Sequence, residues 1–325
     1  MYLEHFKLNK APFQIAPDDR FLYLSPQHSK ALVYMDYAAW QPDGFVIVTG
    51  EIGSGKSTLA KRLLRKIKNK SVCFHLPFTN LKNNELLGYL ARQAKIGVSE
   101  TDKVSMIYAL TDYFKEITSS GVPCILIVDE AQNLSKENLE DIRMLAGLED
   151  ANGSTMLRVV MLGQPEFMNT VSASEQLRQR VKLHYHITGL NEEEVEQYIK
   201  YRLEVSGLLN SNLFDKQLIK SIYKISKGIP RLINKICDSL LMCAFSEGKA
   251  KPELSDFEEI AQDLMMMPIE EPSSTAHGST AAKEDGQALE RIAAALESIE
   301  KVLSKSLAET DNRKDRSFLR LKAAK

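Results

Sequence analysis

The chain has 325 residues, of which 44% are hydrophobic and 26% are charged, and its formal net charge is -1. This is the composition of a globular protein with room for one α/β domain and smaller additions. The near-neutral balance excludes a chain that attracts nucleic acid through its overall charge, although a local basic patch is compatible with it.

No apolar run approaches the length of a membrane-spanning helix, so we expect no transmembrane segment. The start of the chain, MYLEHFKLNK, lacks the apolar region of a signal peptide. Cys73 and Cys124 lie in or beside apolar runs and no cysteines form a CxxC pair, which indicates core thiols in a reducing compartment. We therefore expect a cytoplasmic protein, with any association at the inner membrane being peripheral.

Residues 1–43 form a mixed segment interrupted by prolines, and a regular alternation begins after it. Strands are predicted at 44–50, which is a buried run, and at 71–76, 124–130, 157–163 and 181–187. Helical patterns follow Lys56, cover 84–94 and 102–119, and begin again near Lys136. Strands that alternate with helices predict an α/β core with a parallel five-stranded sheet over residues 44–187.

The pattern changes after residue 187. Asn191, followed by the acids of NEEEVEQYIKYRLEVSG, marks the start of a helix. Further helices are predicted over 215–226, 230–246 and 254–266. Because no strand pattern intervenes, residues 188–267 are predicted to form a small all-helical lid domain.

Three short segments are predicted after the lid. Residues 268–287 have the composition of a disordered linker. Residues 288–307 place apolar side chains at alternating spacings of three and four, the pattern of a short coiled coil. Residues 308–325 form a basic tail, which we expect either to touch an anionic surface or to be solvated.

The strongest motif is GEIGSGKS at residues 50–57, between a predicted strand and a predicted helix. It matches G-x-x-x-x-G-K-[ST], the P-loop or Walker A motif. Backbone N–H groups and the helix start hold phosphates there, Lys56 neutralises the β- and γ-phosphates, and the Ser57 hydroxyl binds Mg²⁺. The predicted nucleotide contacts are Gly50, Glu51, Ile52, Gly53, Ser54, Gly55, Lys56, Ser57 and Thr58.

The second motif is ILIVDEAQ at residues 125–132, a Walker B pattern. Its apolar strand delivers Asp129 to the carboxyl edge of the sheet, where ligands bind in such folds. Asp129 is the second predicted Mg²⁺ ligand, and Glu130 is placed to polarise the attacking water. The predicted cofactors are therefore ATP and Mg²⁺, and the predicted reaction is ATP hydrolysis. An acidic strand end that only faces solvent is the plainer interpretation, and the P-loop disfavours it.

Weaker signals lie further along the chain. Gln164 ends a buried strand and can orient water or sense the γ-phosphate. Arg178 and Arg180, in LRQRV, precede the fifth strand, from which an arginine can reach a neighbouring subunit. Arg231, in GIPRLIN, begins a lid helix. Each of these residues also has a plain interpretation as a loop or surface residue.

His184 and His186 share one face of a strand, which can suggest a metal site. No carboxylate or cysteine lies at ligand spacing near them in the sequence, so a metal site there is disfavoured.

Together these residues resemble an AAA+ ATPase and, more narrowly, the ExeA-like family (general secretion pathway protein A). The narrower resemblance rests on HFKLNKAPFQIAPDDRFLYLSPQHSKAL before the P-loop, and on DEAQNLS, LGQPEF, LRQRV and GIPRLIN in that order. It covers about residues 1–265. Asp19 stands where proline is common in the family, and Gly147 where asparagine is common.

The resemblance implies a role for each weaker signal. Gln164 would be the sensor-1 residue, Arg231 the sensor-2 residue, and Arg180 the arginine finger, with Arg178 as the second candidate. Tyr23–His28 would lie near the adenine. A finger that acts in trans needs a neighbour, so the resemblance also implies a homo-oligomer in the form of a ring or filament.

The resemblance leaves the biological role open. One hypothesis is an accessory ATPase for envelope secretion, pilus or polysaccharide export assembly, with a membrane or envelope protein as partner. The alternative is a DNA-binding regulator of transposition type that forms ATP-dependent polymers on duplex DNA, for which the basic tail is mild support. A nucleotide switch with little hydrolysis is a third hypothesis, and Glu130 argues against it.

Overall fold

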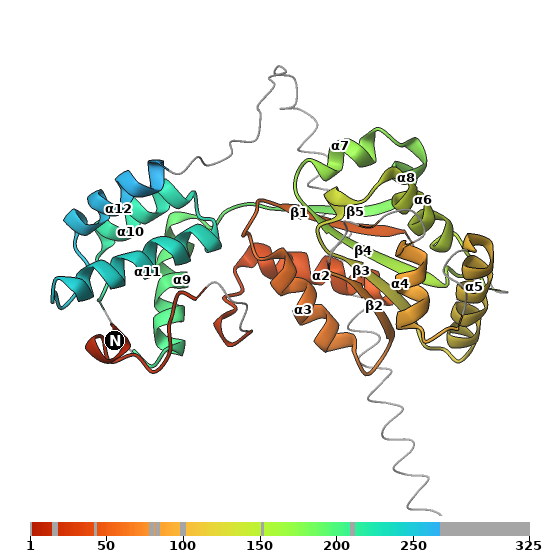
Figure 1. The fold of residues 1–325 in the computed structure, drawn as a ribbon, viewed down its shortest axis with the longest axis horizontal. Coiled ribbons are helices and arrows are strands. Elements are labelled where there is room, and N and C mark those ends of the chain that lie inside the picture. Colours follow the sequence, from red (N-terminus) through yellow and green to blue (C-terminus); the bar gives the residue numbers. More distant parts are fainter. Residues whose placement is uncertain are drawn as a thin grey trace, which may run out of the picture. The chain divides into compact units, whose positions relative to one another are not determined.

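The computed structural model describes residues 2–14, 19–41, 44–77, 81, 85–97, 102–150, 153–208 and 212–266 (Figure 1). Residues Met1–Met267 form one compact unit. The linker predicted at 268–287, the coiled coil at 288–307 and the tail at 308–325 lie outside the described residues.

A parallel five-stranded sheet forms the centre of the first unit, in the order β2-β3-β4-β1-β5. Its strands are β1 Phe45–Gly50, β2 Val72–Leu76, β3 Cys124–Val128, β4 Leu157–Gly163 and β5 Val181–Ile187. Every residue of β1 and β3 is buried, which explains their continuous apolar runs. With the helical domain described below, this confirms the predicted fold class, a P-loop NTPase core with a small all-helical lid.

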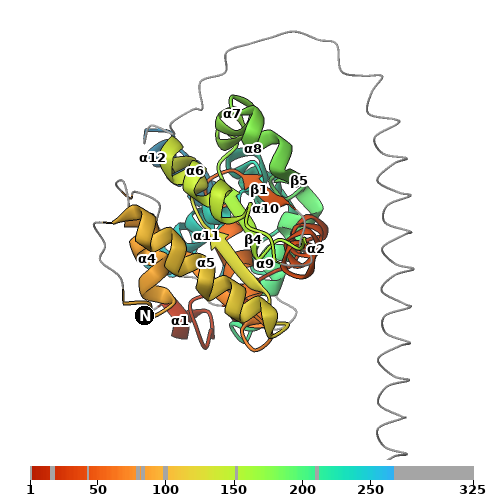
Figure 2. The ribbon, with the colours of Figure 1, turned by 90° about the vertical axis from the view of Figure 1, so that its right-hand side faces the viewer.

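Alternate residues of the strands enter two different hydrophobic cores. The first core packs β-strand side chains such as Phe74 and Leu126 against α4 Glu85–Gln93, α5 Lys103–Ser119 and α6 Lys136–Leu145. The second packs Val48 and Ile127 against α2 Pro26–Trp40 and α3 Lys56–Ile67. Figure 2 shows α4 and α5 side by side, and Figure 1 shows α2 and α3 together. The sheet is thus covered by helices on both faces.

Helix α2 corrects the interpretation of residues 1–43 as a mixed segment. Pro26 acts as a first-turn residue rather than a breaker, and the Ser25 side chain caps the helix by accepting a hydrogen bond from the His28 N–H. The Arg158 side chain donates a 2.6 Å hydrogen bond to the Ala39 carbonyl, which fixes the end of the helix to β4. The prediction also missed α1 Tyr2–His5, α7 Phe167–Ser172, α8 Glu175–Arg180 and the 3₁₀ turns η1 Asp19–Phe21 and η2 Ala131–Asn133.

The predicted strand at 124–130 was too long. It ends at Val128, and Glu130 adopts a left-handed backbone conformation with φ 54°. A side-chain-bearing residue rarely adopts this conformation, which turns the chain sharply out of the sheet. Asp129 and Glu130 therefore lie just beyond the strand.

Helices α9 Glu192–Val205, α10 Lys216–Ser226, α11 Pro230–Ser246 and α12 Leu254–Met266 share a third core. Asn191 and Glu194 form a reciprocal capping box at the start of α9. Phe6, Leu8 and Phe13 from the beginning of the chain are buried in the same core. In the part of the chain that the structure describes, no helix has both the length and the apolar character needed to cross a membrane.

The buried face of α2 yields a stability prediction. Met35 is fully buried, so Met35→Ala should lower the free energy of unfolding by about 2–5 kcal/mol, the usual cost of a cavity of this size. Val33 lies on the same helix with 52% of its side chain exposed, so Val33→Ala should change that free energy by less than about 0.5 kcal/mol. Urea unfolding measures both, and equal losses would contradict this placement of α2.

Candidate functional site

The loop between β1 and α3 depends on two glycines with positive φ, 84° at Gly53 and 101° at Gly55. A Cβ on Gly53 would lie 2.4 Å from the Cβ of Arg231, and one on Gly55 would lie 3.0 Å from His28 Nε2. Both glycines are therefore required by conformation and by space. The Arg231 N–H also donates to the Gly53 carbonyl at 3.3 Å, so the start of α11 lies against the loop.

Lys56 lies inside this loop with 5% of its surface exposed. Its Nζ donates hydrogen bonds to the carbonyls of Gly50 at 2.6 Å and Glu51 at 2.9 Å. Burial lowers the pKa of the ammonium, and the nearby Glu130 and Asp129 carboxylates oppose this effect. The Ser54 hydroxyl is buried in the same loop and has no hydrogen-bond partner among the residues that the structure describes. An anionic ligand with several oxygens would suit both groups.

Asp129 follows β3 and is 6% exposed. Burial raises the pKa of its carboxyl, and a hydrogen bond from Ser57 partly opposes that rise. The Glu130 N–H donates to Asp129 Oδ1 at 3.1 Å. The hydroxyl and the carboxylate that the sequence predicted as Mg²⁺ ligands are thus in contact, and hard oxygen donors of this kind suit Mg²⁺.

The side chain of Gln132, in η2, joins Glu130 to the end of β4. Its Nε2 donates to Glu130 Oε2 at 2.6 Å, and its Oε1 accepts from the Gln164 N–H at 3.0 Å. Sequence analysis gave Gln132 no role, although it follows the predicted catalytic glutamate by two positions in DEAQ. The structure therefore brings Glu130 and the backbone of Gln164 together through a third residue.

A pocket lies over the loop, between the sheet domain and the helical domain. It is lined by Gln14, Phe21, Leu22, Tyr23, His28, Ile52, Gly53, Gly55, Lys56, Ser57, Thr58, Glu130, Tyr198, Arg202, Pro230, Arg231 and Asn234. The predicted phosphate-binding loop, Glu130 and Arg231 thus share one pocket with Tyr23 and His28 from the segment expected near adenine.

His28 forms a hydrogen bond with the backbone of the loop between β1 and α3. Its Nε2 lies 2.8 Å from the Ser54 carbonyl, which can only accept, so Nε2 carries the proton. Its Nδ1, 2.7 Å from Ser25 Oγ, then accepts from that hydroxyl. Burial lowers the pKa of this imidazole, which favours the neutral tautomer that the two contacts require. This contact could not be predicted from the sequence, because its two residues are 26 positions apart.

Arg202 forms the wall of the pocket on the lid side. Its guanidinium donates to the Pro12 carbonyl and, at 2.8 Å, to the Tyr198 hydroxyl, which donates in turn to Asn234 Oδ1 at 2.8 Å. It also lies over the Phe21 ring, 5.0 Å from the centroid. This buried network ties the N-terminal segment to α9 and α11. Sequence analysis missed it because one arginine in an amphipathic helix gives no distinguishing signal.

Arg178 and Arg180 lie at the end of α8, and neither is among the described residues that line the pocket. Arg178 is exposed, whereas Arg180 is half-buried beside Gly147, where an added Cβ would lie 3.1 Å from Arg180 Nη2. The absence of a side chain at position 147 therefore leaves room for Arg180.

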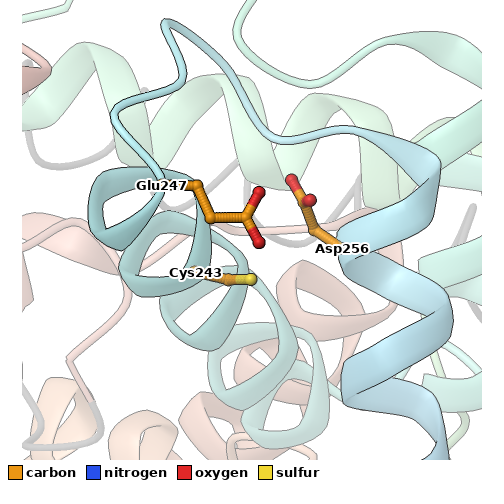
Figure 3. A group of neighbouring side chains, drawn as sticks. All are labelled: Cys243, Glu247 and Asp256. Carbon is orange, nitrogen blue, oxygen red and sulfur yellow. The ribbon is translucent and has the colours of Figure 1, made fainter.

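Two groups that resemble metal sites are explained by other contacts. The Thr49 hydroxyl lies 2.8 Å from His184 Nε2 and 3.0 Å from His186 Nδ1, so it serves both imidazoles. Cys243, Glu247 and Asp256 converge between α11 and α12 (Figure 3). Lys249 already supplies a cation there, because its Nζ lies 2.5 Å from Glu247 Oε2 and also pairs with Asp256.

Comparison with known proteins shows the family to which the chain belongs. Residues 39–171 match a family model described as an AAA domain. Over 254 residues the chain is 32% identical to general secretion pathway protein A of Aeromonas hydrophila, covering 77% of this chain and 46% of that protein. The chain therefore spans about half the length of this curated relative. The resemblance drawn from the sequence is confirmed.

Solved structures share the fold. Cdc6p of Pyrobaculum aerophilum is 16% identical with a TM-score of 0.58, over 76% of this chain and 71% of that chain. The ORC2 protein of Aeropyrum pernix, in ADPNP and ADP complexes, is 14% identical with a TM-score of 0.57, over 81% and 73%. At these identities the likeness concerns the fold alone.

Asp129 yields a prediction about pH. Because burial raises its pKa in the folded state, the ionised carboxylate destabilises the nucleotide-free protein as pH rises through that pKa. Asp129→Asn should therefore raise the melting temperature at neutral pH, and the difference should shrink as pH falls below the unfolded-state pKa of about 3.9, where the aspartate becomes protonated in both states.

Asp102 provides a control with the opposite sign. Hydrogen bonds from Ser105 and Val104 lower the pKa of this fully exposed aspartate, so its contribution is present above its unfolded pKa and is lost on acidification. Asp102→Asn should not raise the melting temperature at neutral pH. Thermal unfolding from pH 3.5 to 8 measures both variants, and a pH-independent gain in Asp129→Asn would contradict the electrostatic explanation.

Proposed function

The chain carries an AAA domain and is related to general secretion pathway protein A, and from this we propose that it binds Mg²⁺ with ATP and hydrolyses the nucleotide. The observation that carries the proposal is the convergence of Lys56, Ser57 and Glu130 on one pocket, with Asp129 bonded to Ser57.

Phosphate would bind to the loop between β1 and α3, in which Gly53 and Gly55 have no side chains to block its approach. The Lys56 ammonium lies within this loop on two carbonyls, from which it can turn to phosphate oxygens. Ser57 and Asp129 would hold Mg²⁺, which when bound neutralises charge on the β- and γ-phosphates. Both residues are already in contact, so little rearrangement is needed to form this pair of ligands.

Glu130 would act as the general base. It lines the pocket beside the loop, and its carboxylate is held at one oxygen by Gln132. A carboxylate in this place can orient a water molecule and take its proton as the water attacks the γ-phosphate. Gln164, whose backbone ends the same chain of contacts, would sense that phosphate, and Arg231 would do so from the lid.

We propose an accessory role in envelope secretion, pilus or polysaccharide export assembly, exerted from the cytoplasm on a membrane or envelope protein. Two observations support this pathway. The relative with 32% identity is named for general secretion, and the residues before the P-loop carry the narrower family resemblance. ATPase activity that duplex DNA stimulates, and that high salt returns to its basal rate, would instead favour the DNA-binding alternative.

The first functional prediction separates binding from turnover. Lys56→Ala should abolish ATP binding, because the phosphates lose their cation. Glu130→Gln should bind ATP normally and lower kcat by at least about 10²-fold, the scale of general-base catalysis. Calorimetry measures binding and phosphate release measures turnover. Lys66→Ala is a control in the same helix, because Lys66 pairs with Asp36 on the surface. Wild-type turnover in Glu130→Gln would overturn the assignment of the base.

We further propose that Arg180 completes the site of a neighbouring subunit, with Arg178 as the second candidate. Neither arginine lines the pocket of its own chain among the described residues, which supports an action in trans. A finger of this kind increases the rate of phosphoryl transfer by about 10³- to 10⁵-fold. The proposal requires a homo-oligomer, so activity per subunit should rise with protein concentration.

Mixing inactive variants tests this arrangement. Arg180→Ala and Lys56→Ala should each be nearly inactive alone, and a mixture should regain part of the activity, because an intact pocket then meets an intact arginine at some interfaces. A mixture of Lys56→Ala with Glu130→Gln is the matched control and should stay inactive, because both residues belong to the same pocket. An inactive first mixture in which both proteins assemble would exclude Arg180, and Arg178 would be tested next.

A further inference from the structure

Gln132 occupies the space between the catalytic candidate Glu130 and the end of β4. Both ends of its amide group are engaged, at 2.6 Å with Glu130 Oε2 and at 3.0 Å with the Gln164 N–H. The side chain is half-buried and belongs to η2, the single turn that follows the catalytic candidate.

The contact with β4 fixes which way the amide points. The Gln164 N–H can only donate, so the group that faces it must be the Gln132 carbonyl oxygen. The Nε2 donor is then directed at Glu130, whose ionised carboxylate can only accept. If the amide were flipped, Nε2 would face the Gln164 N–H, donor against donor, and Oε1 would face the Glu130 carboxylate, acceptor against acceptor. The backbone of β4 therefore orients the donor that holds the carboxylate.

The space for Gln132 is provided by Gly163, the last residue of β4. A Cβ at this position would lie 3.3 Å from Gln132 Oε1 and 3.1 Å from the Cβ of Phe167. Both distances are tighter than ordinary van der Waals contact, so a larger residue would press on the amide. The absence of a side chain at position 163 therefore leaves room for the Gln132 amide beside the end of β4.

Glu130 is held at its backbone by two hydrogen bonds, from its N–H to Asp129 Oδ1 and from the Asn133 N–H to its carbonyl, and its carboxylate is held by Gln132. It follows the strand in a left-handed conformation, φ 54° and ψ 42°, which is unfavourable for a residue with a side chain. A general base must hold its oxygen within hydrogen-bond reach of the water, and a misplacement of about 1 Å can cost 10²-fold in rate.

We infer that Gln132 is a positioning residue, which holds the Glu130 carboxylate in the orientation for water activation and couples it to the end of β4. The inference rests on the proposed ATPase function and deepens it. Under the plainer interpretation, Gln132 only fastens η2 to the sheet, and its loss would affect stability alone.

Two variants separate these interpretations. Gln132→Leu removes both hydrogen bonds. Gln132→Glu keeps an acceptor for the Gln164 N–H but places a second carboxylate against Glu130. If Gln132 positions the base, each variant should lower kcat by about 10- to 100-fold at neutral pH while changing the KM for ATP by less than about threefold. Gln93→Leu is the matched control, since Gln93 likewise bonds strand backbone through both ends of its amide, at the N–H and carbonyl of His75.

The split between kcat and KM distinguishes positioning from fastening. If Gln132 only fastens η2 to the sheet, both variants should lose stability and keep the wild-type kcat. If Gln132 positions the base, kcat should fall while the KM for ATP stays nearly constant. A wild-type kcat in Gln132→Leu would overturn the inference.

Wild type and Glu130→Gln are measured in parallel, so that failure of the positioning role can be distinguished from failure of the proposed ATPase function. An inactive Glu130→Gln beside a fully active Gln132→Leu would reject the positioning role and leave the proposed function intact. A wild-type protein without ATPase activity would overturn the proposed function and this inference together. Melting temperatures show that each variant is folded, and loss of stability without loss of kcat would also count against positioning.

Discussion

Parallel pairing of β3, β4 and β1 is the constraint on which the site depends. Val128 is in register with Met161, and Gly163 with Thr49, so the ends of these strands meet at one edge of the sheet. Each following loop then contributes one part to the site, which is the backbone proposed to bind phosphate, the acidic pair or the polar residue at a strand end. Residues separated by more than a hundred positions become neighbours because the strands end together.

The parts predicted well from the sequence are those whose signal is local. The strands at 157–163 and 181–187 have the predicted bounds. The first is a largely apolar, buried run, and in the second apolar and polar residues alternate along a half-exposed strand. The P-loop is recognisable because close backbone approach requires glycine at fixed positions. The third strand was predicted to extend past Val128, because no residue in VDEAQ indicates the left-handed turn at Glu130.

Long-range contacts account for what the sequence could not reveal. Helix α2 was hidden by Pro26, whose effect depends on whether it stands inside a helix or at its start. His28, Arg202 and Gln132 gain their roles from partners that only the folded chain brings near. Sheet order is likewise set by packing between distant segments. Contacts between distant segments produce no periodic pattern in the sequence around each residue.

The third hydrophobic core joins the two ends of the described chain, since Phe6 and Phe13 pack with Phe257. During synthesis the first two leave the ribosome long before the last exists. At about 5–20 residues per second, the delay is roughly ten to fifty seconds. Over that interval the sheet domain between them can already form, whereas these aromatic side chains remain without their native partners. The nascent chain therefore exposes these apolar side chains while their partners are still missing, so a requirement for chaperone protection would concentrate on the segment that contains Phe6 and Phe13.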